Sequence, residues 1–379
     1  MKDIQKINNP NRDEKIIDAC SIFGAMDTSG KCFSGQGVIS AIANMRDRGN
    51  GLGGGFAIYG LYPEHAECYA FHIMFLAADQ RPTVEEFLKD NFTIVEAGEV
   101  STRRIPQVTD PPLVWRYFLK IKEDVLGKQS EEEFIVEKTM MINTGLKGSF
   151  VFSGGKNMAA FKGVGFPEEM AEFFRLEDYK GYIWTAHGRF PTNSPGWWGG
   201  AHPFSLLDWT VVHNGEISSY GTNRRFLEQY GYQCTMQTDT EVVAYAADLL
   251  MRKHNLPVEV AADVMAAPFW HDIERKEAGA EKELLISLRQ VYAGLLLNGP
   301  FTVIISRHGQ MIGLTDRVRL RPLTVGTKGD MLYLSSEESA IRLISPQLND
   351  VWIPMGGEPI IGEVGSLPTK AQSWEKARC

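Results

Sequence analysis

The stretch Ala19-Cys20-Ser21-Ile22-Phe23-Gly24 marks the point where the folded part of this sequence begins. From Cys20 to Met26 the residues are small or apolar, which predicts a buried β-strand. Residues 1–19 are polar and charged and show no periodicity, so we expect a leader that precedes the folded domain. A cysteine in a strand is usually a packing residue, but the position of Cys20 at the start of the domain favours a chemical role.

Removal of the leader would give Cys20 a free α-amino group beside its thiol. An α-amine has a pKa of about 7.7–8.0 in model peptides, so it can act as a base near neutral pH. One residue would then supply both the nucleophile and its base. Because Met1 is the only methionine before Cys20, exposure of this residue requires a proteolytic or self-catalysed cleavage after Ala19.

Short apolar strands alternate with helices along the rest of the chain. Strands are predicted at 20–26, 55–62, 66–75, 149–153, 158–164, 182–186, 210–213, 301–306 and 331–335, and helices at 83–90, 131–141, from 238 onward and at 281–297. The helix at 238 begins with the capping box Thr238-Asp239-Thr240-Glu241, in which the first hydroxyl and the last carboxylate each bind a free N–H group. This pattern predicts an α+β fold with two packed sheets covered by helices. A polar tail, residues 363–379, follows the domain at 20–362.

Composition excludes several classes of protein. The formal charge is −8 and no basic stripe is present, so nucleic acid is not an expected partner. No apolar run has the length of a membrane span, and the first residues lack the apolar middle of a secretion signal, which favours the cytoplasm. The five cysteines are odd in number and form no Cys-x-x-Cys pair, which argues against a disulfide framework and against a metal site.

Two later turns carry polar groups, one suited to binding an amino acid and the other to stabilising the transition state of an attack on a carbonyl. Arg189, in the stretch 185–194, offers a planar set of donors for a carboxylate; the alternative is a structural arginine paired with a surface acid. Asn214 and Gly215 follow an apolar strand. An Asn-Gly turn is ordinary hairpin chemistry, but an amide side chain and a backbone N–H at such a turn can also form an oxyanion hole.

Asp239 completes the set of candidate site residues. It can be a simple helix N-terminal acid, which the helix dipole favours, or a carboxylate that binds a substrate ammonium group. Together with Cys20, Arg189 and the Asn214-Gly215 turn, it would supply the groups needed to hydrolyse the side-chain amide of an α-amino acid.

The ordered set of motifs resembles the class II glutamine amidotransferases, and in particular the amidotransferase part of glutamate synthase. The matching pieces are Cys20 with its leader and residues 46–51, 187–193, 213–217, 238–241, 316–323 and 335–337. The resemblance covers roughly residues 20–345 and implies the four-layer αββα sandwich of N-terminal-nucleophile hydrolases, built from two mainly antiparallel sheets. Glutamate synthases of the larger type have propeptides, so the leader fits that branch.

The resemblance also implies a role for each site residue. Cys20 would attack L-glutamine and form a γ-glutamyl thioester, with Asn214 and the N–H of Gly215 as the oxyanion hole. Arg189, with Thr192 nearby, would bind the α-carboxylate and Asp239 the α-ammonium group. Arg48 would belong to a loop over the bound glutamine.

The sequence contains no synthase motif, so the ammonia acceptor is expected on a second polypeptide in a hetero-oligomer. By resemblance, that partner would be a glutamate synthase subunit carrying flavin, with an iron-sulfur cluster as a second candidate cofactor of the partner subunits and no cofactor in this chain. The alternatives are the amidotransferase subunit of N-methylglutamate synthase, a stand-alone amide hydrolase, and an uncleaved regulatory or scaffold subunit without activity. The pairing of Arg189 with Asp239 argues against the stand-alone hydrolase, because it suits a zwitterionic amino acid.

Overall fold

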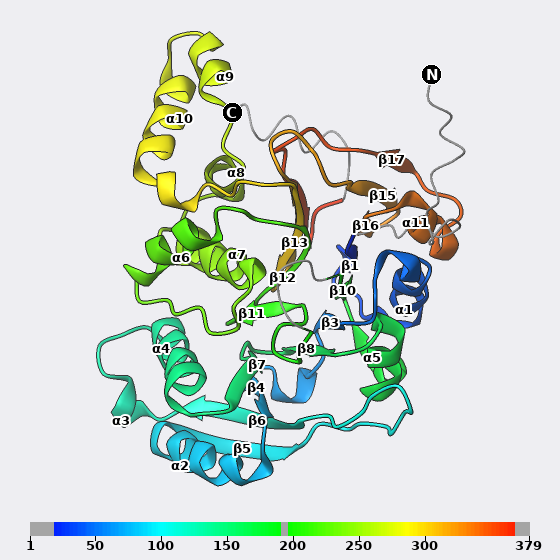
Figure 1. Ribbon diagram of the computed structural model, residues 1–379, viewed down its shortest axis with the longest axis vertical. Coiled ribbons are helices and arrows are strands. Elements are labelled where there is room, and N and C mark those ends of the chain that lie inside the picture. The colour runs from blue at the N-terminus through cyan, green and yellow to red at the C-terminus, as the bar shows by residue number, and fades with distance from the viewer. Residues whose placement is uncertain (1–18, 191–195, 368–379) are drawn as a thin grey trace, which may run out of the picture.

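The computed structural model describes residues 19–190 and 196–367 (Figure 1). The predicted leader up to residue 18, Thr192 and the end of the predicted tail from residue 368 lie outside the described residues. Two antiparallel sheets form the centre of the molecule. The first contains β1 (Ser21–Asp27), β3 (Gly54–Tyr59), β8 (Met158–Gly163), β10 (Ile183–Gly188), β15 (Thr324–Lys328), β16 (Met331–Ser335) and β17 (Asp350–Trp352), in the order β17-β15-β16-β1-β10-β3-β8.

The second sheet packs face to face on the first. It contains β11 (Phe204–Leu206), β12 (Trp209–Gly215), β13 (Phe301–Arg307), β14 (Gln310–Thr315) and β18 (Ile360–Glu363), in that order. Ile22 and Met26 of β1 share a buried cluster with Val212 and Ile304 of the second sheet. At Gly24 the approach is close, since an added Cβ would lie 2.9 Å from the sulfur of Met311. Only a residue without a side chain allows this spacing.

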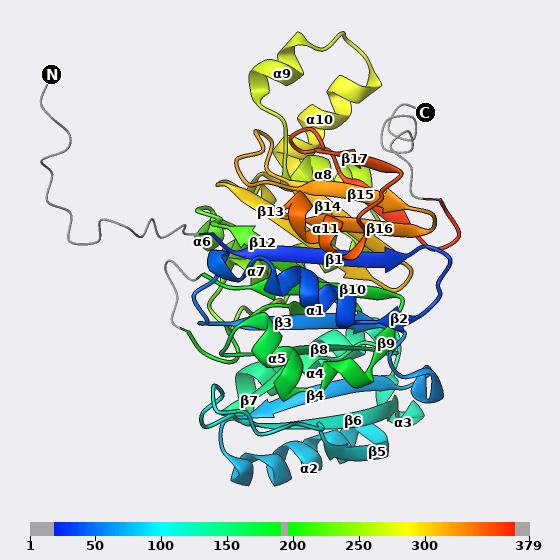
Figure 2. The same ribbon diagram turned by 90° about the vertical axis from the view of Figure 1, so that its right-hand side faces the viewer.

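Helices cover the outer face of each sheet. On the first sheet lie α1 (Gln36–Ala43), α5 (Pro167–Phe173) and α11 (Glu338–Ile344), and Figure 2 shows α1 and α5 over β1, β10 and β3. On the second sheet lie α6 (Tyr220–Glu228), α7 (Asp239–Ala247) and α8 (Val258–Met265). Beyond them project α9 (Trp270–Arg275) and α10 (Ala280–Val291), at the top of both views. The predicted α+β fold, a four-layer αββα sandwich, is confirmed.

A third sheet was not predicted. It contains β4 (Tyr69–Phe75), β5 (Phe92–Glu99), β6 (Leu113–Ile121) and β7 (Ser149–Ser153) in the order β5-β6-β4-β7, and α2 (Arg81–Asn91), α3 (Glu123–Leu126) and α4 (Glu131–Gly145) accompany it. Two of its strands, β5 and β6, were not predicted. Strand β5 is largely exposed and its register shifts between Ile94 and Glu96, which breaks the alternation of apolar residues. A short pair, β2 (Phe33–Ser34) and β9 (Lys180–Gly181), completes the strands.

Two predicted helices differ from the observed ones. The predicted capping box at Thr238 is only half formed: Thr238 Oγ1 accepts the N–H of Glu241 at 3.4 Å, but the Glu241 carboxylate accepts the N–H groups of Thr235 and Met236, both at 2.9 Å. The segment before the helix turns back toward Glu241, and its N–H groups bind both carboxylate oxygens. The helix predicted at 281–297 ends at Val291 and is followed by a 3-10 turn, Ala293–Leu295. Among the described residues, no helix is both long and apolar enough to cross a membrane.

Candidate active site

Cys20 lies directly before β1 and beside the end of β10. Its sulfur accepts the N–H of Phe190 at 3.3 Å, and the pairing of Ser21 with Gly188 holds the two segments together. Burial raises the pKa of the Cys20 thiol, while the Phe190 N–H and the charge of Arg189 act in the opposite direction. The sulfur is therefore held in place within a site where a nearby base would be needed to make it a thiolate.

Arg189 comes from the same turn as Phe190 and is almost fully buried, with 4% of its surface exposed. Burial lowers the pKa of Arg189, whereas Cys20 and Asp239 raise it. Because both groups act electrostatically on the guanidinium, the three side chains share one region of the protein. Gly200 leaves room beside the guanidinium: an added Cβ would lie 3.3 Å from Nη1 of Arg189.

Asn214 and Gly215 end β12 and face the start of β1. Asn214 is fully buried and its Nδ2 donates to the hydroxyl oxygen of Ser336 at 3.4 Å. The same oxygen accepts the N–H of Ile22 at 3.1 Å, so Ser336 joins the Asn214 side chain to the strand that begins at Cys20. Gly215 has a φ of +143°, and an added Cβ would collide with the carbonyl of Pro300. The turn therefore requires glycine at this position.

Asp239 is the first residue of α7 and is oriented by several hydrogen bonds. Its Oδ2 accepts the N–H of Ile217 at 2.9 Å, and its Oδ1 accepts the hydroxyl of Thr240 at 3.3 Å and lies 3.6 Å from Nδ1 of His213. Burial alone would raise the pKa of Asp239, but the charge of His213 and these hydrogen bonds lower it overall. The carboxylate is thus ionised near neutral pH and available to a cation.

Arg48 reaches the nucleophile from the 3-10 helix Arg46–Arg48. Its Nε donates to the main-chain carbonyl oxygen of Cys20 at 3.2 Å, and its Nη1 pairs with Glu337 at 2.9 Å. Arg48 therefore contacts the backbone of Cys20, a contact that the sequence did not predict. The predicted position of Thr192 next to Arg189 stays a prediction, because Thr192 lies outside the described residues.

A buried histidine cluster beneath this region was missed. The ring of His187 stacks on that of His202 with 3.9 Å between centroids, and His187 Nε2 lies 2.9 Å from the carbonyl oxygen of His213. His202 Nε2 lies 3.2 Å from the hydroxyl of Thr240. Burial lowers the pKa of His187 to about 3, so its ring is neutral. His187 and His213 lie in the motifs at 187–193 and 213–217, but only their contacts in the structure show that they support the residues around Asp239.

Lys162 is a second buried group that the sequence did not single out. It lies in β8, is 1% exposed and donates from Nζ to the carbonyl oxygen of Gly199 at 3.0 Å. This contact fixes the segment that places Gly200 beside Arg189. The sequence feature that could have identified Lys162 was its position in the otherwise apolar predicted strand at 158–164.

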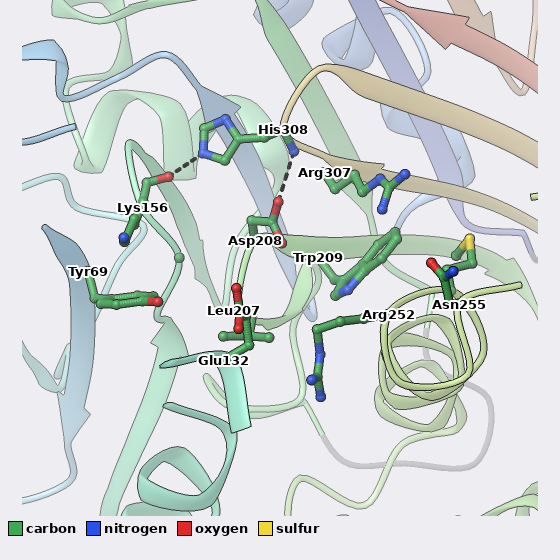
Figure 3. A pocket seen from close by; sticks show the side chains of 12 residues that line it. Tyr69, Glu132, Lys156, Leu207, Asp208, Trp209, Arg252, Asn255, Arg307 and His308 are labelled. Atoms are coloured by element: carbon green, nitrogen blue, oxygen red, sulfur yellow. Dashed lines mark hydrogen bonds between the residues drawn. The ribbon is translucent and has the colours of Figure 1, made fainter. Parts of the chain in front are cut away.

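A pocket of about 410 Å³ lies elsewhere in the molecule (Figure 3). Trp209 and Arg307 line it, and they stand at the ends of β12 and β13 opposite to Gly215 and Phe301. A seven-residue strand spans roughly 20 Å. In Figure 3 His308 bonds to Asp208 and to the carbonyl of Lys156, so polar groups in this pocket already satisfy one another. The pocket is separate from the candidate active site.

The groups around Cys20 form a chemically coherent set. They comprise a thiol, a buried arginine suited to a carboxylate, an ionised aspartate suited to an ammonium group, and an Asn-Gly turn with an amide and a backbone N–H. Among the described residues, no group of three or more His, Cys, Asp or Glu side chains could hold a metal ion. The arrangement can bind a zwitterionic amino acid and stabilise charge on a carbonyl oxygen.

The chain is similar to several known proteins. A family model for class II glutamine amidotransferases matches residues 69–241, a range that includes Arg189, Asn214 and Asp239 but begins after Cys20. An uncharacterized protein of Archaeoglobus fulgidus is 55% identical over 357 residues, which make up 93% of this chain and 94% of the relative. A protein of Methanothermobacter thermautotrophicus, named as a candidate glutamine amidotransferase, is 24% identical over 330 residues, or 85% of this chain and 93% of that one. Among solved structures, the glutamine phosphoribosylpyrophosphate amidotransferase of B. subtilis matches 91% of this chain and 47% of its own, with a TM-score of 0.45 and 16% identity.

Proposed function

Since the chain belongs to the class II glutamine amidotransferases, enzymes that release ammonia from glutamine, we propose that Cys20 is its nucleophile and that the ammonia passes to an acceptor on a second polypeptide. The observation that carries this proposal is the position of the Cys20 sulfur. It is bound to the N–H of Phe190 and lies close enough to Arg189 and Asp239 for both to influence the pKa of its thiol. A positive and a negative side chain, suited to the two charged groups of an amino acid, therefore lie near a thiol whose sulfur is held in place.

The reaction begins once the bond between Ala19 and Cys20 is cut. The freed α-amine accepts the thiol proton, and the sulfur attacks the side-chain carbonyl carbon of glutamine. Negative charge develops on the carbonyl oxygen, where the amide of Asn214 and the N–H of Gly215 would stabilise it. The ammonium form of the Cys20 amine returns the proton to the leaving nitrogen, and ammonia departs. Water then attacks the γ-glutamyl thioester, releasing glutamate and restoring the thiol.

Recognition of the amino acid depends on two opposite charges. Arg189 would bind the α-carboxylate, since a guanidinium offers two parallel donors to such a group. Asp239, held by Ile217 and Thr240, would bind the α-ammonium group. Thr192 would add a hydroxyl beside the carboxylate. These contacts would select free glutamine over amides that lack either charge, as in proteins or short-chain amides.

For the acceptor, we favour a glutamate synthase-like subunit that carries flavin. The support is the order of motifs along the chain, including residues 316–323 and 335–337, together with the leader before Cys20. The amidotransferase of N-methylglutamate synthase is the alternative. A cytoplasmic location also stays a prediction.

The test combines the mass of the chain with its activity. The mature protein should begin at Cys20 and hydrolyse L-glutamine, and Cys20→Ala should lose this activity while keeping its fold by circular dichroism. Incubation with an electrophilic glutamine analogue should label Cys20 and no other cysteine; Cys68, which is buried, serves as the internal control. A chain that stays full-length and has no activity would instead support the regulatory or scaffold alternative.

A further inference from the structure

Six exposed apolar side chains gather at one end of the molecule, and they are called the apolar edge below. They are Phe269, Trp270, Val318, Leu320, Ile353 and Met355. Leu320 and Met355 are the most open, with 62% and 60% of their surface exposed. Side chains of this size normally face the core when they can, and a group of them on the surface marks an interaction site.

Direct contacts join the three segments that carry the apolar edge. The guanidinium of Arg317 lies over the ring of Phe269, 4.3 Å from its centroid, and donates to the carbonyl oxygen of Ala267 at 3.1 Å. Arg319 donates to the carbonyl oxygen of Pro354 at 3.1 Å. The residues before α9, the loop at 316–321 and the segment after β17 therefore form one continuous surface, beside the helices that project at the top of Figure 1.

The apolar edge adjoins the candidate active site. Nη2 of Arg317 donates to Oδ1 of Asn298 at 2.8 Å, and the carbonyl oxygen of Asn298 accepts the N–H of Ser218 at 2.8 Å, just after the Gly215 turn. At the other end of the loop, Arg321 lies close enough for its charge to oppose in part the rise that burial causes in the pKa of the Cys20 thiol. A partner seated on the edge would thus stand next to the place where ammonia is released.

The loop that carries Val318 and Leu320 is built to keep one shape. The buried carboxylate of Asp316 accepts the N–H groups of Val318 at 3.0 Å and of Leu320 at 2.8 Å, and also that of Phe301 at 3.2 Å. A surface that is already ordered loses less conformational entropy when it binds. Arginine and aromatic residues, both present here, are enriched in the centres of protein interfaces.

We propose that the apolar edge is the docking surface for the subunit that consumes ammonia, and that the facing surface of this subunit is apolar with carboxylates opposite Arg317, Arg319 and Arg321. This proposal rests on the proposed function, which requires an acceptor on a second chain. Ammonia that escapes into water is protonated and loses its nucleophilicity, so the acceptor site gains from lying beside Cys20. A second copy of this chain fits less well, because a two-fold interface centred on the loop would bring its arginines against their own copies.

The first experiment locates the partner on the surface. A photo-crosslinking amino acid is placed at Leu320 in the tagged full-length chain, expressed in its own host, and a matched variant carries it at Leu76, which is 57% exposed at the end of β4. We expect an adduct from position 320 alone, with a protein that makes its product from ammonia when assayed by itself. Any of three results would overturn the proposal. They are an adduct with a second copy of this chain, an adduct with that synthase from position 76 only, and no adduct from position 320.

The second experiment measures the energetic role of the edge with the synthase so identified. The double variant Val318→Ser/Leu320→Ser should bind it at least about tenfold more weakly, while Leu76→Ser should bind like the wild type. Binding should also weaken as salt is raised, because charge pairs at the rim are screened. Equal affinity of the double variant and the wild type would refute the assignment.

Glutaminase activity, measured for the wild type and for the double variant without the partner, distinguishes failure of the docking proposal from failure of the proposed function. If the wild type and the double variant both hydrolyse glutamine but dock equally well, the docking proposal fails and the proposed function stands. If the mature wild-type chain does not hydrolyse glutamine, the proposed function itself fails.

Discussion

Arg48 donates its Nε–H group to the main-chain carbonyl oxygen of Cys20 at 3.2 Å. The arginine is itself held by Glu337, whose carboxylate lies 2.9 Å from Nη1. Residues that are far apart in the sequence thereby fix the backbone of the candidate nucleophile. The direction of the thiol depends on that backbone, because Cys20 lies directly before β1; Arg48 holds its main chain while the N–H of Phe190 holds its sulfur.

Replacing Arg48 should lower the catalytic rate more than substrate affinity. Arg48→Ala removes a charged donor whose hydrogen bond is worth about 1.5–3 kcal/mol, so kcat should fall roughly tenfold to a hundredfold. Steady-state glutamine hydrolysis measures this. Glu337→Gln keeps a hydrogen-bond acceptor for Arg48 and should have a smaller effect. An unchanged kcat in Arg48→Ala would show that this contact does not position the nucleophile.

The hydroxyl of Ser336 should matter for the oxyanion hole although it does not touch the substrate. It accepts the N–H of Ile22 and also bonds the side chain of Asn214, so it orients the amide. Asn214→Ala should reduce kcat by about 10²–10³-fold. Ser336→Ala should reduce kcat by less, since the amide remains but is no longer fixed.

The combination of the two changes distinguishes orientation from simple destabilisation. If Ser336 acts through Asn214, the double variant should be no slower than Asn214→Ala, because the effects of residues that act as a unit are not additive. Multiplicative effects in the double variant, or a normal rate in Ser336→Ala, would contradict the role given to Ser336. Thermal unfolding of each variant controls for loss of fold.

Asp239→Asn should raise the KM for glutamine and leave the fold intact. The carboxylate binds the ammonium group in the proposed complex, and the loss of a charged hydrogen bond of about 1.5–3 kcal/mol corresponds to roughly a tenfold to hundredfold fall in kcat/KM. An amide substrate without the α-amine should be poor for the wild type and should not become poorer in the variant. A variant that still discriminates between the two substrates would rule out this role.

The lowered pKa of Asp239 predicts that the free energy of unfolding decreases in acid. Its folded pKa is lowered overall, although burial alone would raise it, because the charge of His213 and several hydrogen bonds favour the ionised form. The stabilising contribution is therefore present above the ordinary Asp value of about 3.9 and is lost as the pH falls through the lower folded value. Urea unfolding of the wild type and of Asp239→Asn should show a difference that shrinks in this acidic range.

Local sequence patterns predicted seven of the twelve strands of the two central sheets, but not the fully buried β14. The strand at Ser149–Ser153 has the predicted bounds, and the strand after Cys20 lies between β10 and β16 in the middle of its sheet. Such strands are buried on both faces and consist of apolar runs that short windows detect. Strand β5 was not predicted because five of its eight residues are exposed and its register shifts near Ile94.

Contacts between distant segments could not be predicted in the same way. Glu241 was assigned to a capping box from its spacing to Thr238, yet its carboxylate binds the N–H groups of Thr235 and Met236. Spacing shows that a carboxylate is near the helix start, but it does not show which free N–H groups the preceding loop will bring closer. The functions given to Cys20 and Asp239 likewise stay predictions until the variants are measured.

Lys162 provides a test of electrostatics beneath the candidate site. Burial lowers the pKa of Lys162 to about 7; Glu241 opposes this shift and Arg189 adds to it. The amine also lies over the ring of Phe204, 4.2 Å from its centroid, and donates to the carbonyl oxygen of Gly199. These neighbours satisfy the amine but do not restore the hydration that an ammonium ion loses on burial.

The sign of the resulting pH dependence follows from the two states of the chain. An unfolded lysine has a pKa of about 10.4. Between about pH 7 and pH 10 the unfolded chain therefore binds a proton that the folded protein does not, and stability should rise with pH in this window, by at most about 1.4 kcal/mol per unit. In Lys162→Met this contribution should disappear, so the free energy of unfolding of the wild type minus that of the variant should increase between about pH 6.5 and about pH 9.5. Lys156→Met, at a partly exposed lysine, should leave the slope unchanged, and parallel pH profiles for the wild type and Lys162→Met would refute the lowered pKa.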